Sequence, residues 1–288
     1  MNQTTEPLFS RGFRLLLRHI RPFLLLTFSF GVVAFGISYL FTPQYKADIT
    51  LIPSEETLGV DQNSLLGGFS SIASLVGAGA GALGNKESEA LAILKSRGLV
   101  LSYMQEHELL PILFSKKWDS TAHKWKSDKK SYVPTLEDGY VVFDKQIRNI
   151  VENRKTNVIT LYITWQDPRL AKQWADGLVD AANTLIRQQV IERSTNNLEY
   201  LTAASEKTPI MEIKNSIYKL MESEIKKQMI ATGNKNYAFR VVDPAIVPER
   251  KVFPKHSYFG IFGAIVGAMI WFLLVSFRDR ESESTQVR

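Results

Sequence analysis

The sequence contains no cysteine and only four histidines in 288 residues. Without cysteine, disulfide bonds and thiolate metal sites are excluded, which is compatible with an oxidising compartment that makes no use of disulfides. The histidines are far apart, and none has the His-x-x-x-His or Glu-x-x-His spacing of a metal site. A Gly-x-Ser-x-Gly nucleophile turn is also missing. We therefore expect no catalytic centre, no cofactor and no metal ion.

Charge is missing from two long stretches near the ends of the chain. Residues 22–42 (PFLLLTFSFGVVAFGISYLFT) and 257–277 (SYFGIFGAIVGAMIWFLLVSF) contain no charged side chain. At about 1.5 Å per residue, a helix of either stretch would span the roughly 30 Å hydrocarbon core of a bilayer. The first stretch is longer than the apolar region of a signal peptide, and the residues directly before Gln44 (Phe-Thr-Pro) do not form a small-x-small cleavage site. The sequence thus predicts two transmembrane helices, the first retained as an anchor.

Basic residues flank both apolar stretches on the side of the chain termini. They are Arg11, Arg14, Arg18 and Arg21 before the first, and Arg278, Arg280 and Arg288 after the second. Because short cytoplasmic segments are rich in Lys and Arg, the tails 1–21 and 278–288 are predicted to be cytoplasmic. Residues 43–256 then form a domain outside the cytoplasm, since long segments are translocated largely regardless of their charge.

A glycine-rich stretch, residues 65–84, contains Gly79-x-Gly81-x-x-Gly84, the spacing of a dinucleotide-binding turn. Such a turn needs a strand before it, but the preceding residues read GGFSSIAS. A phosphate-binding P-loop needs Gly-Lys-Ser/Thr, and here Gly84 is followed by Asn85. The predicted location also separates this stretch from cytoplasmic NAD and ATP. We interpret it as an adaptable loop or short, closely packed helices.

Hydrophobic periodicity predicts an α+β domain between the apolar stretches. A period of two marks one face of a half-buried strand at Ile159, Leu161, Ile163 and Trp165. The predicted strands are 45–53, 146–152, 158–165 and 237–248.

The predicted helices of this domain are 87–107, 135–144, 168–207 and 210–231. Asp167–Pro168 is a helix start, with Asp as the N-cap and Pro at the first helical position. Pro209 interrupts the helical pattern, because it cannot donate a backbone hydrogen bond. We expect the last two helices to form a long antiparallel hairpin that projects from a small, membrane-proximal sheet.

The polar segment 114–134 is predicted to be a basic loop. It holds two tryptophans among the lysines Lys116, Lys117, Lys124, Lys126, Lys129 and Lys130. Indole faces stack on sugars, and lysines attract anionic sugars or lipid phosphates. Trp118, Trp125, Lys124 and Lys126 are therefore candidate contacts for a glycan or a lipid. The alternative is a solvated loop pinned by two packed tryptophans. Nucleic acid, which would also suit this composition, is not expected outside the cytoplasm.

The approach to the second apolar stretch reads VVDPAIVPERKVFPKHSYFGIFGAIVGAMI. Its motif residues are the prolines Pro244, Pro248 and Pro254 and the glycines Gly260, Gly263 and Gly267. With PQYKADITLIPS, SEALAILKSRGLV and NVITLYITWQDPRLAKQWADGLVDAANTLI, this segment resembles the polysaccharide co-polymerases, the chain-length determinant proteins of bacterial O-antigen and capsular polysaccharide assembly. The stretch 65–84 also resembles a loop of that family. Few residues follow Phe277, so we expect no fused tyrosine-kinase domain.

The resemblance implies a two-pass protein of the bacterial inner membrane, with both termini cytoplasmic and the main domain periplasmic. It further implies a non-catalytic, ring-like homo-oligomer that regulates how far a polymerase extends a lipid-linked glycan, O-antigen or a related polysaccharide. Three alternatives stay open: a two-helix membrane sensor or adaptor, a membrane-anchored enzyme acting on sugars, and a co-polymerase that acts in exopolysaccharide export with a separate kinase.

The glycines of the second apolar stretch also predict a helix–helix contact. Gly263-x-x-x-Gly267 places two positions without side chains one turn apart. In lipid, close backbone approach through small residues provides much of the association between helices. The expected partners are Gly31 and Gly36 of the first stretch, in the same or an adjacent subunit.

Overall fold

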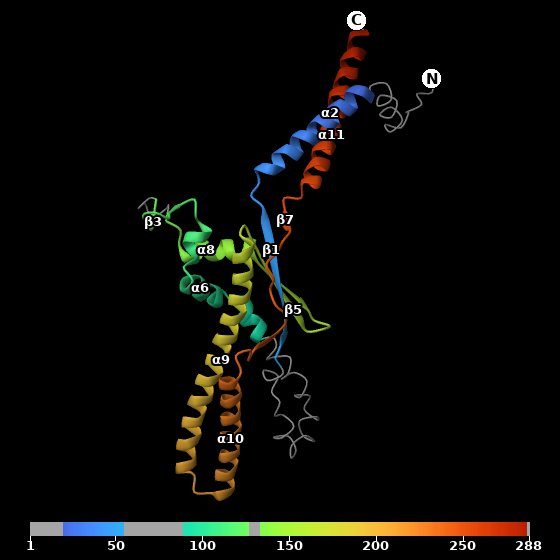
Figure 1. Cartoon of the computed structure of the whole chain (residues 1–288). Helices are drawn as coiled ribbons and strands as arrows, with labels where there is room; N and C mark the ends of the chain where they lie inside the picture. The colour runs from blue at the N-terminus through green and yellow to red at the C-terminus, as the bar shows by residue number, and fades with distance from the viewer. Residues whose placement is uncertain (1–19, 55–88, 127–132, 287–288) are drawn as a thin grey trace, which may run out of the picture. The chain divides into compact units, whose positions relative to one another are not determined.

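The computed structural model describes residues 20–54, 89–126 and 133–286 (Figure 1). The chain divides into two compact units. We call Met1–Gln44 with Arg250–Arg288 the terminal unit, and Tyr45–Glu249 the central unit. The arginines before Ile20 and the glycine-rich stretch 65–84 lie outside the described residues.

The terminal unit consists mainly of the two apolar stretches, which are both helical as predicted. Its elements are α2 (Ile20–Ile37), a short 3₁₀ helix η1 (Ser38–Leu40), strand β7 (Lys251–Phe253) and α11 (His256–Gln286). Arg21–Leu40 and His256–Leu274 are long and apolar enough to cross a bilayer. Large apolar side chains on α2 are exposed, Leu25 by 71% and Phe28 by 73%, as expected of a surface that faces lipid.

The central unit contains an antiparallel sheet with strand order β4-β5-β1-β6. The strands are β4 (Arg148–Asn153), β5 (Val158–Trp165), β1 (Gln44–Pro53) and β6 (Phe239–Asp243). The pairing of β1 with β5 places Ile49 opposite Leu161, and both side chains are buried. Ile159, Leu161 and Ile163 all point into the core, so the predicted period of two in β5 is confirmed.

Two long helices follow the sheet strand β5: α9 (Pro168–Lys207) and α10 (Met211–Gly233). Asp167 is the N-cap of α9, where its Oδ1 accepts hydrogen bonds from the N–H groups of Arg169 (2.8 Å) and Leu170 (3.4 Å). The helices contact each other and form the predicted hairpin (Figure 1). Buried apolar side chains of α9 end at Ile186, so only its N-terminal half packs into the core. The remainder of α9 is supported by α10.

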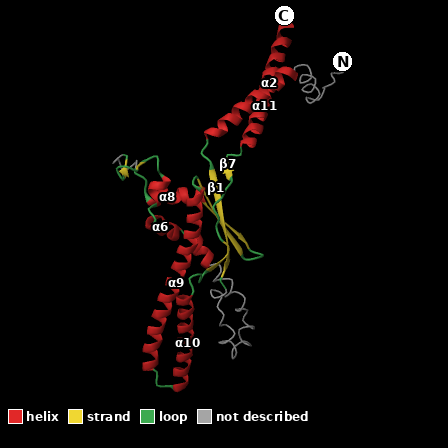
Figure 2. Cartoon of the chain, viewed as in Figure 1, coloured by secondary structure: helices red, strands yellow, loops and turns green. Residues whose placement is uncertain are grey.

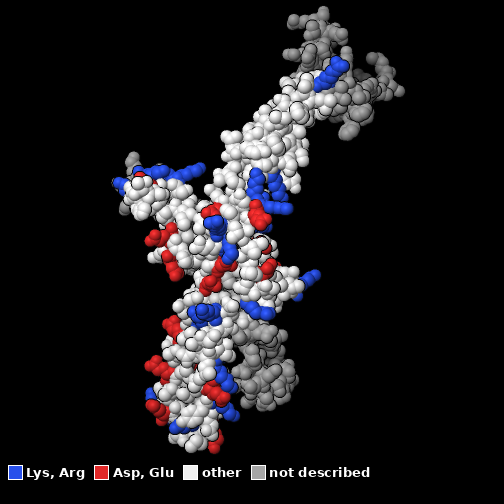
Figure 3. Space-filling model, in the orientation of Figure 1, with Lys and Arg blue, Asp and Glu red and all other residues white. Residues whose placement is uncertain are grey.

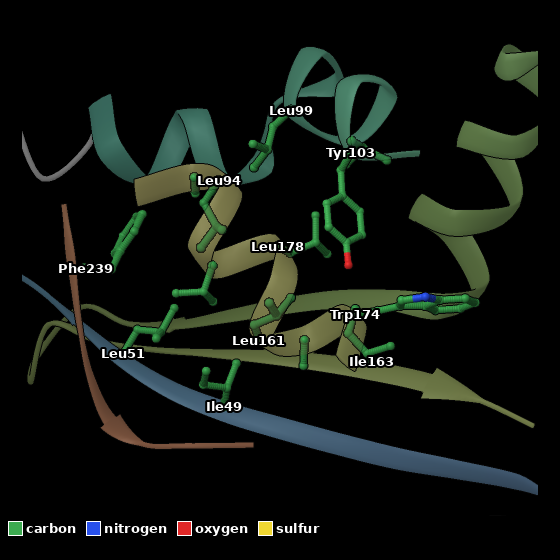
Figure 4. Packing of buried hydrophobic residues seen from close by; sticks show 14 of the residues in the cluster. Ile49, Leu51, Leu94, Leu99, Tyr103, Leu161, Ile163, Trp174, Leu178 and Phe239 are labelled. Carbon is green, nitrogen blue, oxygen red and sulfur yellow. The ribbon is translucent and has the colours of Figure 1, made fainter. Parts of the chain in front are cut away.

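The core lies between the sheet and the first half of α9 (Figure 4). Side chains from β1, β5, β6, α6 (Arg97–Glu106) and α9 converge there. The fully buried large ones include Ile49, Leu51, Leu161, Trp174 and Phe239. Figure 2 shows strands and helices in separate regions of the chain, an α+β architecture as predicted.

The predicted helix 87–107 is wrong as one element, because it breaks at Ser96. Ser96 is extended (ψ 147°), and its Oγ accepts a hydrogen bond from the N–H of Leu99 (3.2 Å), so it caps α6. Arg148 satisfies the carbonyls at the end of the preceding turn of helix, donating to Leu94 (2.8 Å) and Lys95 (3.1 Å). Both ends of the break therefore have hydrogen-bond partners.

Other differences are local. A short helix α7 (Leu109–Leu113) was not predicted, and the predicted loop 114–134 contains a two-stranded hairpin of β2 (Trp118–Asp119) and β3 (Lys124–Trp125). Helix α8 (Leu136–Val142) continues as a π-helix, η2 (Phe143–Ile147), so that β4 begins at Arg148. Strand β6 ends at Asp243, since the following Pro244 has no N–H for the ladder.

Candidate functional site

The β2–β3 hairpin brings together the four residues proposed from the sequence as glycan or lipid contacts. Trp118 lies opposite Trp125 in the register, with ring centroids 4.9 Å apart in an edge-to-face arrangement. Lys124 and Lys126 flank Trp125 and are exposed. Lys126 Nζ donates a hydrogen bond to the carbonyl of Lys116 (2.9 Å), which ties β3 to the residues before β2.

Asp119 shapes the turn between these two strands. Its Oδ1 accepts hydrogen bonds from the N–H groups of Thr121 (2.9 Å) and Ala122 (3.1 Å). These bonds, with help from the charges of Lys126 and Lys124, lower the pKa of the Asp119 carboxyl. His123 completes the turn at φ 49°, a left-handed conformation. The turn is therefore held by a carboxylate that stays ionised at neutral pH.

A depression of about 380 Å³ adjoins this hairpin. Trp118 lines it together with Trp165, the last residue of β5, and with the loop residues Gln166 and Asp167. The other lining residues come from α7 and the segment around β2: Pro111, Ile112, Ser115 and Ser120. We call this depression the Trp118–Trp165 site.

The Trp118–Trp165 site differs from the sequence-based candidate in its membership. Trp125, Lys124 and Lys126 do not line it, although they share the hairpin with Trp118. Figure 3 shows basic side chains at the β2–β3 hairpin. The sequence placed Trp165 only on the buried face of a strand, because it continues the period of two through Ile163. A tryptophan at the last position of a strand, two residues before a helix N-cap, is the signal that could have identified it.

The prolines and glycines of the family-like motif lie in different surroundings. Pro244 and Pro248 belong to the irregular segment after β6, and Pro254 is buried between β7 and α11. Gly260, Gly263 and Gly267 lie where α11 meets α2. A Cβ added at Gly263 would come within 2.4 Å of the Cβ of Ala34 and 2.6 Å of the carbonyl oxygen of Phe30. These glycines allow the two helix backbones to approach closely.

Of the two glycines predicted on α2, Gly31 lies at the contact with α11 and Gly36 does not. A Cβ added at Gly31 would lie 3.3 Å from the carbonyl oxygen of Gly260, so Gly31 is part of the contact. Gly36 has no heavy atom within 4 Å of the corresponding position, so the structure gives it no such contact within the chain. At Gly267, an added Cβ would lie 2.9 Å from the Cβ of Phe30 and 3.1 Å from the Cα of Thr27.

His256, at the first position of α11, connects the same two helices through polar bonds. Ser38 Oγ donates to the carbonyl of Phe35 (2.6 Å) and lies 2.5 Å from His256 Nδ1, so Nδ1–H is the donor of that second bond. His256 Nε2 is then an acceptor for Lys251 Nζ at 2.6 Å. The Tyr39 ring stacks on the imidazole with centroids 4.2 Å apart. This end of the helix pair is therefore fixed by both stacking and hydrogen bonds.

Among residues 20–54, 89–126 and 133–286, no three His, Asp or Glu side chains are placed to hold a metal ion together. The glycine fingerprint at 79–84 lies outside these ranges. The side chains of Arg278 and Arg280 are not described, so the structure adds nothing to the predicted orientation in the membrane.

Comparison with known proteins shows two similar solved structures. The first is described as a full-length bacterial polysaccharide co-polymerase, with a TM-score of 0.42 and 10% identity, covering 94% of this chain and 97% of the other. The second is a fragment of WzzB, a polysaccharide co-polymerase from Salmonella Typhimurium, with a TM-score of 0.32 and 10% identity, covering 73% of this chain and 100% of the other. No protein-family model matches the chain, and no curated protein sequence does. Since both TM-scores are below 0.5, the function proposed next rests on the chain's own elements.

Proposed function

We propose that this chain is a non-catalytic scaffold of the bacterial inner membrane that regulates the length of a lipid-linked surface polysaccharide, O-antigen or a related polymer, during polymerisation. It carries out no bond making or breaking itself. It acts as a ring-like homo-oligomer beside the polymerase. Both termini are cytoplasmic in this proposal, and the central unit is periplasmic.

The observation that carries the proposal is the packed pair of membrane-length helices at the two ends of the chain. Arg21–Leu40 and His256–Leu274 meet at Gly263 and Gly267, where an added Cβ would lie 2.4 Å and 2.9 Å from the nearest atom of α2. Between them in sequence, one α+β unit carries a 40-residue helix and a 23-residue helix packed as a hairpin. This arrangement agrees with two features that the sequence resemblance implies, a pair of membrane helices and a large domain between them in the sequence.

Exposed apolar residues on α10 support the oligomer. Met211, Tyr218, Ile225 and Met229 recur at spacings of seven, seven and four residues, which places them along one side of the helix. They are 63%, 48%, 45% and 66% exposed, respectively. The side of α10 that faces α9 is a different one, which buries Ile217 and Ala231. A row of exposed apolar side chains along a helix, as the described part of the chain has here, is what an interface between identical subunits requires.

Deletion of the gene, followed by electrophoresis of the cell's surface polysaccharide, tests the proposed function. We expect polymer to persist but its preferred length to disappear, because the polymerase remains and its regulator is gone. Complementation with the intact gene is the control and should restore the preferred length. Complete loss of polymer would indicate an enzyme, and an unchanged ladder of lengths would contradict the proposal.

A further inference from the structure

The chain has five tryptophans, and four of them are gathered at one place in the central unit. Trp118 and Trp165 line the Trp118–Trp165 site. Each is supported by a second indole: Trp125 contacts Trp118 at 4.9 Å, and Trp174 contacts Trp165 at 5.1 Å. Trp174 is itself 2% exposed and anchored in the core. Two partly buried rings are therefore supported by neighbouring indoles that do not line the site.

Polar groups of a particular kind accompany the two rings. The hydroxyls of Ser115 and Ser120 and the amide of Gln166 can each donate and accept hydrogen bonds. The carboxylate of Asp167 accepts only, and its Oδ1 already receives two backbone N–H groups at the start of α9. Among the lining residues that the structure describes, none is a lysine or arginine. The described lining is thus neutral to slightly negative.

We propose that the Trp118–Trp165 site binds a short segment of the glycan, through uncharged sugar residues. A pyranose ring has apolar C–H faces that stack on indole and a rim of hydroxyl groups that both donate and accept. The indoles of the site can contact the C–H faces of the sugar, and its polar side chains can donate to and accept from the sugar hydroxyls. Its volume of about 380 Å³ is at the lower end of small-ligand sites, enough for a few sugar residues.

Other ligand classes fit less well. A purely apolar ligand would displace water from Ser115, Ser120, Gln166 and Asp167 without replacing its hydrogen bonds, which is unfavourable. A phosphate or other anion would approach Asp167, and the described lining residues include no cation to compensate. The exposed Lys124 and Lys126 project from β3, which is outside the site. The proposal therefore separates the tryptophans from the lysines that the sequence had grouped with them.

This inference rests on the proposed function, because it identifies the glycan as the ligand. Binding at a single, shallow site is expected to be weak. In a ring, each subunit would present one such site to the same polymer, and linked sites bind far more tightly than one alone. Each subunit therefore provides one weak site for uncharged sugars, and tight binding of the polymer requires several subunits of the ring.

Binding can be measured on the full-length protein purified in detergent. The probe is a set of oligosaccharides of one to several repeats, released by mild acid from the surface polysaccharide of the host cell. Saturation-transfer NMR reports which sugar protons contact the protein, and intrinsic tryptophan fluorescence gives the affinity. We expect the longer oligosaccharides to quench or shift the emission, with sugar C–H protons receiving most of the saturation.

Three variants locate the binding. Trp118→Ala should weaken it by about tenfold or more, since a stacking face is lost. Gln166→Ala with Ser120→Ala should also weaken it by about tenfold, and both residues are exposed, so this variant keeps the packing of the hairpin. Lys124→Ala is the matched control on the same hairpin, at an exposed position that does not line the site, and should bind as the parent does.

The outcomes are distinct from those of the gene deletion. Absence of binding by the parent protein, or equal binding by the Gln166→Ala/Ser120→Ala variant, would overturn the inference while a changed length distribution in the deletion strain still supported the function. Loss of binding in the lysine variant would also overturn it, by moving the contact to an anionic group. If Trp118→Ala does not fold, binding by the Gln166→Ala/Ser120→Ala variant tests the inference by itself.

Discussion

Asn183 in α9 and Phe239 in β6 are joined by two hydrogen bonds in opposite directions. Asn183 Nδ2 donates to the carbonyl of Phe239 (3.2 Å), and the N–H of Phe239 donates to Asn183 Oδ1 (2.8 Å). The same Oδ1 accepts from the N–H of Ala238 (2.9 Å). All three residues are buried. One side chain thus acts as the hydrogen-bonding partner of an edge strand, at the point where the chain returns from the α9–α10 hairpin.

Replacing Asn183 by leucine should therefore destabilise the protein strongly. The volume is nearly kept, but two buried N–H groups and one carbonyl lose a partner, and we expect a loss of about 3 kcal/mol in the free energy of unfolding. Urea unfolding of the purified protein, followed by tryptophan fluorescence, measures this. Asn196→Leu, at an exposed position of the same helix, is the control and should change stability by less than about 0.5 kcal/mol. Equal losses of stability in the two variants would show that the hydrogen bonds of Asn183 to Ala238 and Phe239 do not stabilise the protein.

Two glycines in helices should respond to alanine in opposite directions. Gly177 lies in α9, and an added Cβ would come within 2.3 Å of the hydroxyl oxygen of Tyr103, so Gly177→Ala should be destabilising despite the better helix propensity of alanine. Gly98 in α6 has open space at that position, and Gly98→Ala should stabilise by about 0.5–1 kcal/mol. Thermal unfolding compares them. Adding Tyr103→Phe to Gly177→Ala should recover part of the loss; no recovery would mean that the clash is elsewhere.

The contact between α2 and α11 should be lost when Gly263 and Gly267 are both changed to leucine. Leucine favours the bilayer, so insertion should be normal, but the helices must separate. Because the chain has no cysteine, a pair introduced at Phe35 and Gly260 reports this directly: their Cβ atoms would be 3.9 Å apart, within the range of a disulfide. We expect cross-linking in the parent and not in the double variant, with polysaccharide lengths drifting from the preferred value.

Gly36→Leu is the control for the helix contact, since no described atom lies within 4 Å of a Cβ added at Gly36. It should leave both the cross-link and the polysaccharide unchanged. A cross-link between two chains, instead of within one, would assign the contact to adjacent subunits. Undiminished cross-linking in the Gly263→Leu/Gly267→Leu variant would show that these glycines do not set the helix spacing.

The apolar row on α10 should be needed for assembly. Tyr218→Glu with Ile225→Glu places two charges where we propose that a neighbouring subunit packs, and a desolvated charge without a partner is costly. The variant should have a smaller molar mass in light scattering of the detergent-solubilised protein, while its circular dichroism is unchanged. Ser216→Glu, exposed on another side of α10, should assemble like the parent. An oligomer of unaltered size in the double variant would remove this row from the interface.

The buried phenol of Tyr103 should make the protein less stable at high pH. Burial of the phenol, with smaller contributions from Asp180, Glu106 and Asp176, raises its pKa to about 12 from an ordinary value near 10. A raised pKa of an acid means that the unfolded state loses its proton first, so the contribution is complete below about pH 10 and is lost as the pH rises toward 12. The free energy of unfolding should therefore fall less steeply over this range in Tyr103→Phe. Parallel pH profiles for parent and variant would contradict the burial of an un-ionised phenol.

Several elements could be predicted from the sequence because their determinants are local. Strand β5 has its predicted bounds, since the period of two from Ile159 to Ile163 is visible without a partner strand. Helix α9 also begins and ends as predicted, because Asp167–Pro168 forms its cap and Pro209 stops continuation of the helical hydrogen bonds. The two apolar helices follow from length and composition alone.

The tertiary structure decided the features that depend on residues far apart in the chain. The helix predicted over 87–107 breaks at Ser96, where Arg148 donates to the carbonyl of Leu94, and a partner so distant in the sequence is not visible in the local pattern. Only folding shows that Gly31 meets α11 while Gly36 does not. The sequence placed Trp118 in a basic loop and Trp165 in a strand. Their meeting in one depression depends on how α7, β2 and the end of β5 pack, and such packing is a property of the whole domain.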